Sequence, residues 1–233
     1  MSEAREEILA GVRRSLKRGK LDAARETELR EHVAARRRNL VPARAAALTG
    51  PGRVALFVAM AEEVQATVTR VNSPAAVPEV VARYLAAENL PAELVLAPDP
   101  SLDDIPWDAR PLLRIRRGRA EMGDAVSLTP CFAAIAETGT LMLVSGPATP
   151  TTLNFLPDTH IVVVNGNQVV ATYEDGWDRL RTTDGMPRTV NFITGPSRTG
   201  DIEQRIELGA HGPRRLHIIL VDGSQKAGDG EDE

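Results

Sequence analysis

A carboxylate and two hydroxyl groups stand on a glycine-containing turn in the middle of the sequence, at Glu137, Thr138 and Thr140, with Gly139 between them. A carboxylate can act as a general base, or as a nucleophile that forms an acyl anhydride with a thioester substrate. Glu137 is therefore the catalytic candidate, and Thr138, Gly139 and Thr140 are ligand-binding candidates. The alternative is a glutamate that caps a turn or pairs with an arginine, and the spacing leaves both interpretations open.

Two apolar runs rich in β-branched residues follow this turn, at Thr140–Val144 and Ile161–Val164. They are too short for ordinary helices and are bounded by Gly and Pro, so the sequence predicts two strands buried on both faces. The linker from Thr149 to Pro157 contributes two ligand-binding candidates, Thr152 and Asn154. A structured crossover that binds nothing is the equal alternative for this linker.

A third polar stretch, Thr194 to Glu203, follows a strand predicted at 189–194 and opens a helix predicted at 200–208. A helix start presents free backbone N–H groups and the positive end of its dipole, so this stretch predicts an anion site for a phosphate or carboxylate. The ligand-binding candidates here are Gly195, Ser197, Arg198 and Thr199. The alternative is a plain helix start capped by Ser197 or Thr199, with acids already at the positive end.

The rest of the main body alternates short β-branched runs with apolar residues at helical spacing. Further strands are predicted at 67–71, 93–97, 112–116, 125–129 and 216–221. Helices are predicted at 54–66, 77–89 and 167–180. This alternation indicates an α/β fold with a largely parallel sheet and flanking helices, and such sheets bind ligands beyond the carboxyl ends of their strands.

Three regions are predicted along the chain. Residues 1–50 form a helical N-terminal arm, with helices at 6–16 and 21–48, the second interrupted or kinked at Pro42. The α/β domain occupies residues 51–221. Residues 222–233 are acidic and contain glycine, which is typical of a disordered tail.

The formal net charge of −4 hides a gradient along the chain. Residues 1–53 carry 13 Lys and Arg against 7 acids, and residues 222–233 carry one Lys against five acids, which leaves the middle at −6. The basic arm could contact nucleic acid or an acidic protein. A solvated face of Arg-rich helices is favoured, because no nucleic-acid motif accompanies the charge and aromatic residues are only 3% of the chain.

Ligands for metals and clusters are scarce. Cys131 is the only cysteine, so the chain can form no disulfide framework and cannot by itself supply the roughly four thiolates of an iron–sulfur cluster. The histidines, which show no metal spacing, are His32, His160, His211 and His217. We therefore expect no cofactor or metal, and a buried, hydrogen-bonded His217. No apolar run approaches the roughly 20 residues of a membrane span, and we expect a cytoplasmic protein.

Three blocks of sequence, in this order, resemble the lactate utilisation protein C family, the stand-alone LUD domain: AIAETGTLMLVSG, TTLNFLPDTHIVVV and NFITGPSRTGDIEQRIELGAHGPRRLHIILVD. The resemblance spans about residues 50–221. It implies a fold similar to phosphosugar isomerases, coenzyme A transferases and methenyltetrahydrofolate synthetases. It also implies a part in the oxidation of L-lactate to pyruvate, beside partner proteins that contain iron–sulfur clusters.

Three functional hypotheses follow from the residues and the resemblance. The first is a non-redox subunit of a lactate-oxidising system that binds a small carboxylate or a phosphate-bearing ligand. The second is an acyl or coenzyme A transferase, because coenzyme A transferases of the wider fold use a glutamate followed closely by glycine, and Glu137-Thr138-Gly139 is similar. The third is an assembly or regulatory protein whose basic arm docks on the cluster-containing partners.

Overall fold

The computed structural model of the chain describes residues 3–19, 21–38, 43–202 and 205–222. The contacts divide the chain into two units, Met1–Leu40 and Val41–Glu233. The predicted interruption at Pro42 and all but the first residue of the predicted disordered tail at 222–233 lie outside the described residues.

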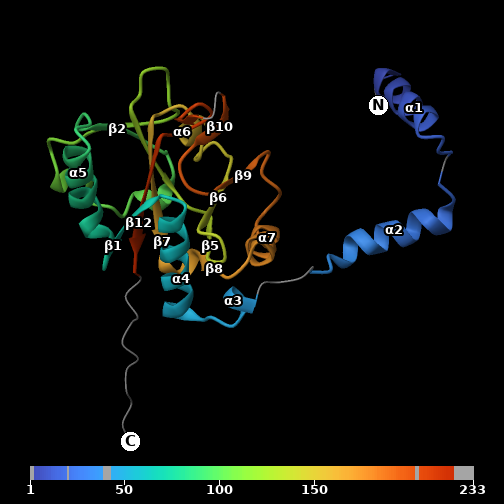
Figure 1. Ribbon diagram of the computed structural model, residues 1–233, viewed down its shortest axis with the longest axis horizontal. Coiled ribbons are helices and arrows are strands. Elements are labelled where there is room, and N and C mark those ends of the chain that lie inside the picture. Colours follow the sequence, from blue (N-terminus) through green and yellow to red (C-terminus); the bar gives the residue numbers. More distant parts are fainter. Residues whose placement is uncertain (1–2, 20, 39–42, 203–204, 223–233) are drawn as a thin grey trace, which may run out of the picture. The chain divides into compact units, whose positions relative to one another are not determined.

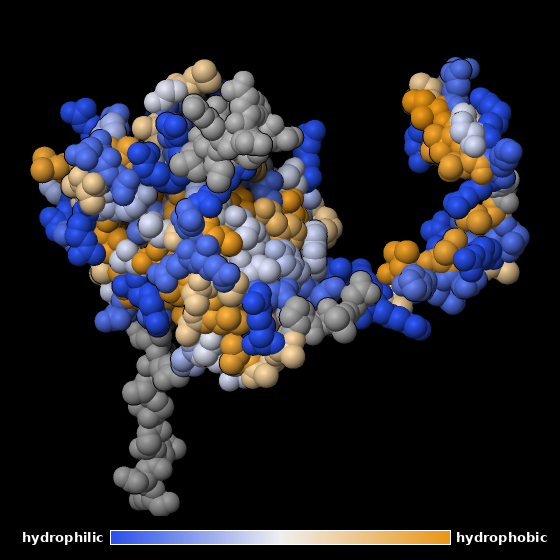
Figure 2. Space-filling view, in the orientation of Figure 1, coloured by the Kyte–Doolittle hydropathy of each residue, from blue (hydrophilic) through white to orange (hydrophobic). Residues whose placement is uncertain are grey.

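The first unit contains the helices α1 (Glu3–Ser15) and α2 (Ala23–Ala35). Asp22 caps α2 by accepting a hydrogen bond from the N–H group of Arg25 at 2.8 Å, and Arg36, at a φ of 43°, ends the helix. The helical stretch predicted at 21–48, with its interruption at Pro42, ends earlier than predicted, because α2 stops at this left-handed residue. The exposed apolar residues of this unit include Ile8, Val12, Leu16, Leu29 and Val33. Figure 2 shows orange, hydrophobic side chains along both helices.

A six-stranded, all-parallel sheet forms the centre of the second unit, in the order β1-β12-β7-β4-β2-β3. Its strands are β1 (Thr67–Val71), β2 (Glu93–Leu96), β3 (Arg114–Arg117), β4 (Val126–Pro130), β7 (Thr159–Asn165) and β12 (Arg215–Val221). The prediction of an α/β fold with a largely parallel sheet is confirmed.

A smaller, four-stranded sheet lies beside it, in the order β8-β5-β6-β9. Its strands are β5 (Ala133–Ile135), β6 (Thr140–Val144), β8 (Val169–Val170) and β9 (Val190–Ile193). β6 runs antiparallel to both β5 and β9. The two buried strands predicted from the central stretch, β6 and β7, both exist, but they belong to different sheets.

The helices of this unit are α3 (Ala43–Ala46), α4 (Gly50–Glu63), α5 (Val77–Ala87), α6 (Thr152–Phe155) and α7 (Tyr173–Arg181). Short 3-10 turns accompany them at η1 (Pro74–Ala76), η2 (Pro100–Leu102), η3 (Trp107–Ala109) and η4 (Gly166–Gln168).

Three hydrophobic clusters join these elements into layers. Leu85 of α5 packs in one cluster with the β4 and β7 side chains on one face of the large sheet. Phe57 of α4 packs on the opposite face, together with Leu141 of the small sheet. Leu180 of α7 packs with Met142 on the outer face of the small sheet. Figure 1 shows this order, from α5 through the two sheets to α7.

Two predicted helices differ from the structure. The helix predicted at 200–208 is wrong: β10 (Arg198–Ile202) and β11 (Arg205–Leu208) form an antiparallel hairpin. Gly200 disfavours a helix and the β-branched residues of this stretch favour strands. The helix predicted at 167–180 begins only at Tyr173, because Thr172 and Asp175 form a reciprocal capping box there.

Candidate functional site

A cavity of about 600 Å³ lies between the large sheet and the small sheet, and we call it the interlayer pocket. Its floor is formed by His160 and Leu216, the second residues of β7 and β12, and by Asn154 of α6. Its walls come from the end of α4, the segment 192–198 and the segment 211–213. The pocket therefore lies near the amino ends of β7 and β12, whereas the fold alone predicted a crevice beyond the carboxyl ends.

Asn154 is the most informative of the predicted ligand-binding residues. The residue is only 4% exposed, it lines the pocket, and its side-chain amide makes no hydrogen bond within the described part of the chain. An amide at a cavity surface has a donor and an acceptor free for a ligand or an ordered water molecule. Asn154 lies where a ligand in the pocket would satisfy it.

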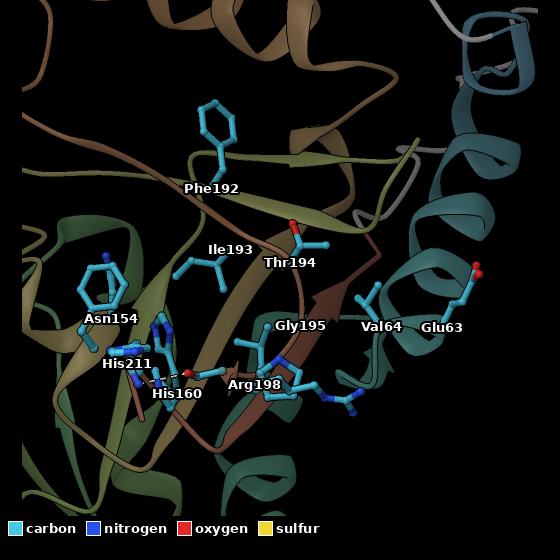
Figure 3. Close-up of a pocket in the computed structure, with 16 residues that line it drawn as sticks. Glu63, Val64, Asn154, His160, Phe192, Ile193, Thr194, Gly195, Arg198 and His211 are labelled. Carbon is cyan, nitrogen blue, oxygen red and sulfur yellow. Dashed lines mark hydrogen bonds between the residues drawn. The ribbon is translucent and has the colours of Figure 1, made fainter. Parts of the chain in front are cut away.

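His160 presents a second unsatisfied polar group in the same pocket. Its Nε2 atom lies 2.8 Å from the hydroxyl oxygen of Thr129 on β4, while its Nδ1 atom is buried without a partner in the described residues. Burial lowers the pKa of His160 to about 3, so the imidazole is neutral at physiological pH. Figure 3 shows Asn154, His160 and His211 at one end of the pocket and Glu63 and Val64 of α4 at the other.

Ser197 and Arg198 line the pocket, but the helix start from which an anion site was predicted here is absent. Arg198 begins a strand, so no helix dipole points at this position. The N–H group of Ser197 donates to the Pro213 carbonyl at 2.8 Å, and its hydroxyl accepts from the N–H group of His211 at 3.3 Å. The guanidinium of Arg198 is thus the cation that this wall offers to an anion.

Gly195 also lines the pocket, and its main role is packing against α4. Its φ is +74°, and a Cβ atom built on it would lie 2.2 Å from the carbonyl oxygen of Val64. Only glycine fits here, because both the left-handed backbone and the close approach exclude a side chain. Gly195 thereby allows the pocket wall to pack closely against the end of α4.

The turn that carries Glu137 lies behind this wall and not in the pocket. Glu137 is 6% exposed, and its Oε1 accepts a hydrogen bond from the N–H group of Tyr173, the first residue of α7, at 3.1 Å. The guanidinium of Arg44 donates to its backbone carbonyl. This geometry matches the alternative of a capping carboxylate, and a chemical role for Glu137 stays a prediction.

The hydroxyl groups of Thr138 and Thr140 form a network with two further residues. Thr140 Oγ1 lies 2.7 Å from Thr138 Oγ1, 2.9 Å from the Tyr173 hydroxyl and 2.7 Å from Thr194 Oγ1. Thr194 lines the interlayer pocket, so the network joins the Glu137 turn to the pocket wall. These hydroxyls bind one another, and Thr140 is fully buried.

Gly139 supports the turn by packing. Its φ is +65°, and a Cβ atom would lie 2.3 Å from the backbone nitrogen of Ala61 in α4. The space beside this glycine, a ligand-binding candidate, is therefore occupied by α4.

Thr152, another candidate, accepts a hydrogen bond from the N–H group of Ala120 at 3.2 Å and does not line the pocket. Thr199 belongs to β10.

Sequence reasoning missed His160 and the contribution of His211 to this pocket. The local signal was a histidine inside the buried run THIVVV, where a polar side chain needs a specific partner. His217 occupies the equivalent setting in β12, and its Nδ1 lies 2.8 Å from the Thr67 hydroxyl while its ring stacks on Tyr84. The prediction of a hydrogen-bonded, buried His217 agrees with these contacts.

Other classes of site find no support among the residues that the structure describes. They contain no group of three or more His, Cys, Asp or Glu side chains placed to hold a metal ion. Cys131 is buried, and burial raises its pKa to about 12, so it is a thiol at neutral pH, as predicted for a small buried residue. No helix in these ranges has both the length and the apolar character needed to cross a bilayer.

Comparison with known proteins gives one family. A family model described as the LUD domain matches residues 54–221. The crystal structure of a DUF162 family protein from Deinococcus radiodurans is similar, with a TM-score of 0.58 and 28% sequence identity, covering 75% of this chain and 99% of that chain.

Several curated relatives are similar in sequence over part of their length. A lactate utilization protein C of Deinococcus radiodurans is 40% identical over 120 residues, which cover 51% of this chain and 54% of that protein. A lactate utilization protein C of a Geobacillus species is 31% identical over 132 residues, 53% of this chain and 52% of that protein. The uncharacterized protein NMB1437 of Neisseria meningitidis is 39% identical over 88 residues, 37% of this chain and 38% of that protein. The chain thus spans about half the length of the curated relatives that it matches, or less.

Proposed function

The chain belongs to the LUD domain family, and we propose that it serves lactate utilisation as a non-redox subunit that binds an organic anion in the interlayer pocket. The family match confirms the resemblance inferred from the sequence. The names of the relatives support the lactate role, and the ligand is a carboxylate or a phosphate-bearing molecule. We place this role in the cytoplasm.

One observation carries the ligand part of the proposal: Asn154, whose amide has no partner among the described residues, and the exposed Arg198 line the same cavity. An amide supplies both a donor and an acceptor, and a guanidinium supplies the charge that pairs with a carboxylate or phosphate. His160 Nδ1 adds a buried polar atom that has no partner among the described residues. A cavity of about 600 Å³ has the size of a typical small-molecule site.

The non-redox part rests on the cysteine content. One cysteine cannot hold an iron–sulfur cluster, and this one is buried and donates a hydrogen bond to the Ala133 carbonyl at 3.0 Å. Electron transfer in a lactate-oxidising system would then belong to separate, cluster-containing partner proteins. We propose these proteins as the partners of this chain.

Thermal unfolding with added ligands tests the proposal. We expect the melting temperature to rise with acetyl-coenzyme A, inorganic phosphate or pyruvate, because a ligand that binds only the folded state adds about 2.7 kcal/mol at a hundredfold excess over its Kd. Arg198→Gln should remove the rise that acetyl-coenzyme A or inorganic phosphate causes. Arg83→Gln, which replaces an exposed arginine of α5, is the matched control and should keep it. No rise with any of these compounds would refute the ligand claim.

A docking role has its own supporting observation. The apolar residues Ile8 and Val12 of α1, and Leu16 directly after it, are 66%, 49% and 58% exposed on a basic arm. A surface of this kind suits an acidic partner protein. Replacing all three by serine should abolish co-purification with the cluster-containing proteins and leave the melting temperature of the main body unchanged. Unaltered co-purification would exclude the arm as the docking segment.

A further inference from the structure

A second, smaller cavity of about 180 Å³ lies at the carboxyl ends of two neighbouring strands of the large sheet. Thr129 and Pro130, the last residues of β4, line it, and so do Asp99 and Ser101, which follow β2. Arg179 of α7 lines another side. We call it the switch-point cavity, because the order of the strands reverses between β2 and β4.

The chain leaves β2 and β4 in opposite directions. β2 connects to β3, which lies on one side of it in the sheet, whereas β4 connects onward to β7, which lies on the other side. The strand order therefore reverses between β2 and β4. In open parallel sheets such a reversal leaves a crevice at the carboxyl ends of the two strands, and ligands bind there. The switch-point cavity occupies this position, which the interlayer pocket does not.

Arg179 gives the cavity a positioned cation. Its Nη1 atom donates to the carbonyl of Asn167 at 3.2 Å, and the centre of its guanidinium lies 5.7 Å from the centroid of the Phe132 ring. These two contacts hold the planar group in place at the cavity edge. A guanidinium has five N–H donors, so donors remain for a bidentate pair with a carboxylate.

Asp99 gives the cavity a positioned acceptor. Its Oδ1 atom accepts hydrogen bonds from the N–H group of Ser101 at 2.9 Å and from the Ser101 hydroxyl at 2.6 Å. Oδ2 makes no hydrogen bond within the described ranges of the chain. An ionised carboxylate only accepts, so this oxygen selects a ligand that presents a hydroxyl or another donor.

The remaining lining is mixed, with polar residues such as Thr129 and Thr149 beside apolar ones. Phe132, Leu143 and Val144 supply apolar surface, and Gln168 is already engaged, because its amide accepts from Asn165 N–H at 2.7 Å and donates to the Cys131 carbonyl at 2.6 Å. Asn154 lines this cavity as well as the interlayer pocket. It is therefore the shared wall between the two.

We propose that the switch-point cavity binds a small 2-hydroxycarboxylate, with Arg179 pairing with the carboxylate, Asp99 accepting from the 2-hydroxyl and the apolar residues covering a short alkyl group. The volume equals that of about six water molecules, which suits a molecule of about six non-hydrogen atoms. Asp99 rejects the 2-oxo analogue, because a ketone oxygen is an acceptor and would face another acceptor. The choice of L-lactate as the test ligand rests on the proposed function, whereas the site rests on topology and lining.

Calorimetric titration of the full chain with L-lactate, pyruvate and propionate tests the proposal. We expect saturable binding of L-lactate, and affinity about tenfold lower for pyruvate and for propionate, each of which lacks the hydroxyl. Arg179→Gln should weaken L-lactate binding by about tenfold or more. Arg181→Gln, on the same helix and outside the cavity, is the matched control and should leave it unchanged. Asp99→Asn should remove the preference for L-lactate over pyruvate.

Comparison of Arg198→Gln with Arg179→Gln shows which of the two cavities binds L-lactate. Arg198→Gln alters the interlayer pocket only, so it should leave L-lactate binding intact. If Arg198→Gln abolishes L-lactate binding and Arg179→Gln does not, the proposal for the switch-point cavity is overturned while the proposed function stands. Absence of any saturable L-lactate binding, or equal affinity for pyruvate, also overturns it. Arg179→Lys, which keeps the charge and loses the planar fork, replaces the glutamine variant if that variant unfolds.

Discussion

The hydroxyl oxygen of Thr140 lies 2.7 Å from that of Thr194, and this hydrogen bond joins the turn after Glu137 to the wall of the interlayer pocket. Thr140 is the centre of the network, because it also contacts Thr138 and the Tyr173 hydroxyl. The catalytic candidate and the pocket are thus neighbours connected through hydroxyl groups, and Glu137 itself faces the start of α7.

Thr140→Val should reveal how much this network contributes. Valine keeps the shape of the buried side chain and removes the hydroxyl, so up to three hydroxyl contacts are lost and the Tyr173 hydroxyl loses one partner. We expect the free energy of unfolding in urea to fall by about 1–3 kcal/mol. Thr69→Val, at a half-buried position in β1, should change it by less than about 0.5 kcal/mol. Equal effects of the two changes would show that the network adds no stability.

Gly139→Ala should destabilise the protein by more than its backbone conformation alone explains. The new Cβ would meet the backbone nitrogen of Ala61 at 2.3 Å, and a helix backbone cannot move aside. Gly185→Ala is the matched control, because Gly185 has a φ of +88° and no atom within 4 Å of its Cβ position. We expect a loss of about 1 kcal/mol for Gly185→Ala and about 3 kcal/mol or more for Gly139→Ala, measured by urea unfolding. Similar losses would show that α4 yields to the added methyl group.

Local patterns were enough to predict most of the strands. Thr67–Val71 and Thr140–Val144 match β1 and β6 to the residue, because β-branched runs of this length are too short for ordinary helices. The same patterns carry no information on partners, which is why the separation of β6 and β7 into two sheets was missed. The pairing of β10 with β11 was missed because neither segment shows an alternating apolar pattern that would predict a strand. Each strand is stabilised by the other.

The candidate site was predictable only in part, for a related reason. Asn154, Ser197 and Arg198 were found as polar residues beside predicted strands, and all three line the interlayer pocket. His160 stands alone within an apolar strand, and it meets Asn154 and Arg198 only when separate segments fold together. The spacing of these residues in the sequence does not predict that they share a pocket. They come together only because the two sheets pack against each other.

His217→Phe should reduce the slope with which the free energy of unfolding falls as the pH is lowered. Burial lowers the pKa of His217 to about 4, so below its ordinary value of 6.5 the unfolded chain takes up a proton that the folded chain does not. The free energy of unfolding therefore falls by about 1.4 kcal/mol for each pH unit between 6.5 and 4 on account of this residue. His160, with a pKa of about 3, adds a similar slope.

Phenylalanine keeps the stack on Tyr84 and removes the buried, unpaired Nε2 atom, and Thr67 can still donate to the Leu216 carbonyl at 3.4 Å. We expect the variant to unfold at pH 7 with a free energy within about 1 kcal/mol of the parent chain and to show about half of its histidine-dependent slope. Urea unfolding at several values between pH 4 and pH 7 measures both. An unchanged slope would mean that His217 is protonated in the folded chain.

Glu137→Gln separates the capping role of this residue from the chemical role. Glutamine keeps an oxygen that accepts from the N–H group of Tyr173, but it loses the negative charge at the start of α7. If the role is structural, the free energy of unfolding should fall by only about 0.3–1 kcal/mol, the usual value for a charge at a helix end. Incubation of the parent chain with acetyl-coenzyme A and hydroxylamine should then leave the Glu137 peptide unmodified in mass spectrometry. A hydroxamate on Glu137, absent from the glutamine variant, would establish an acyl-enzyme intermediate and make acyl transfer the function to pursue.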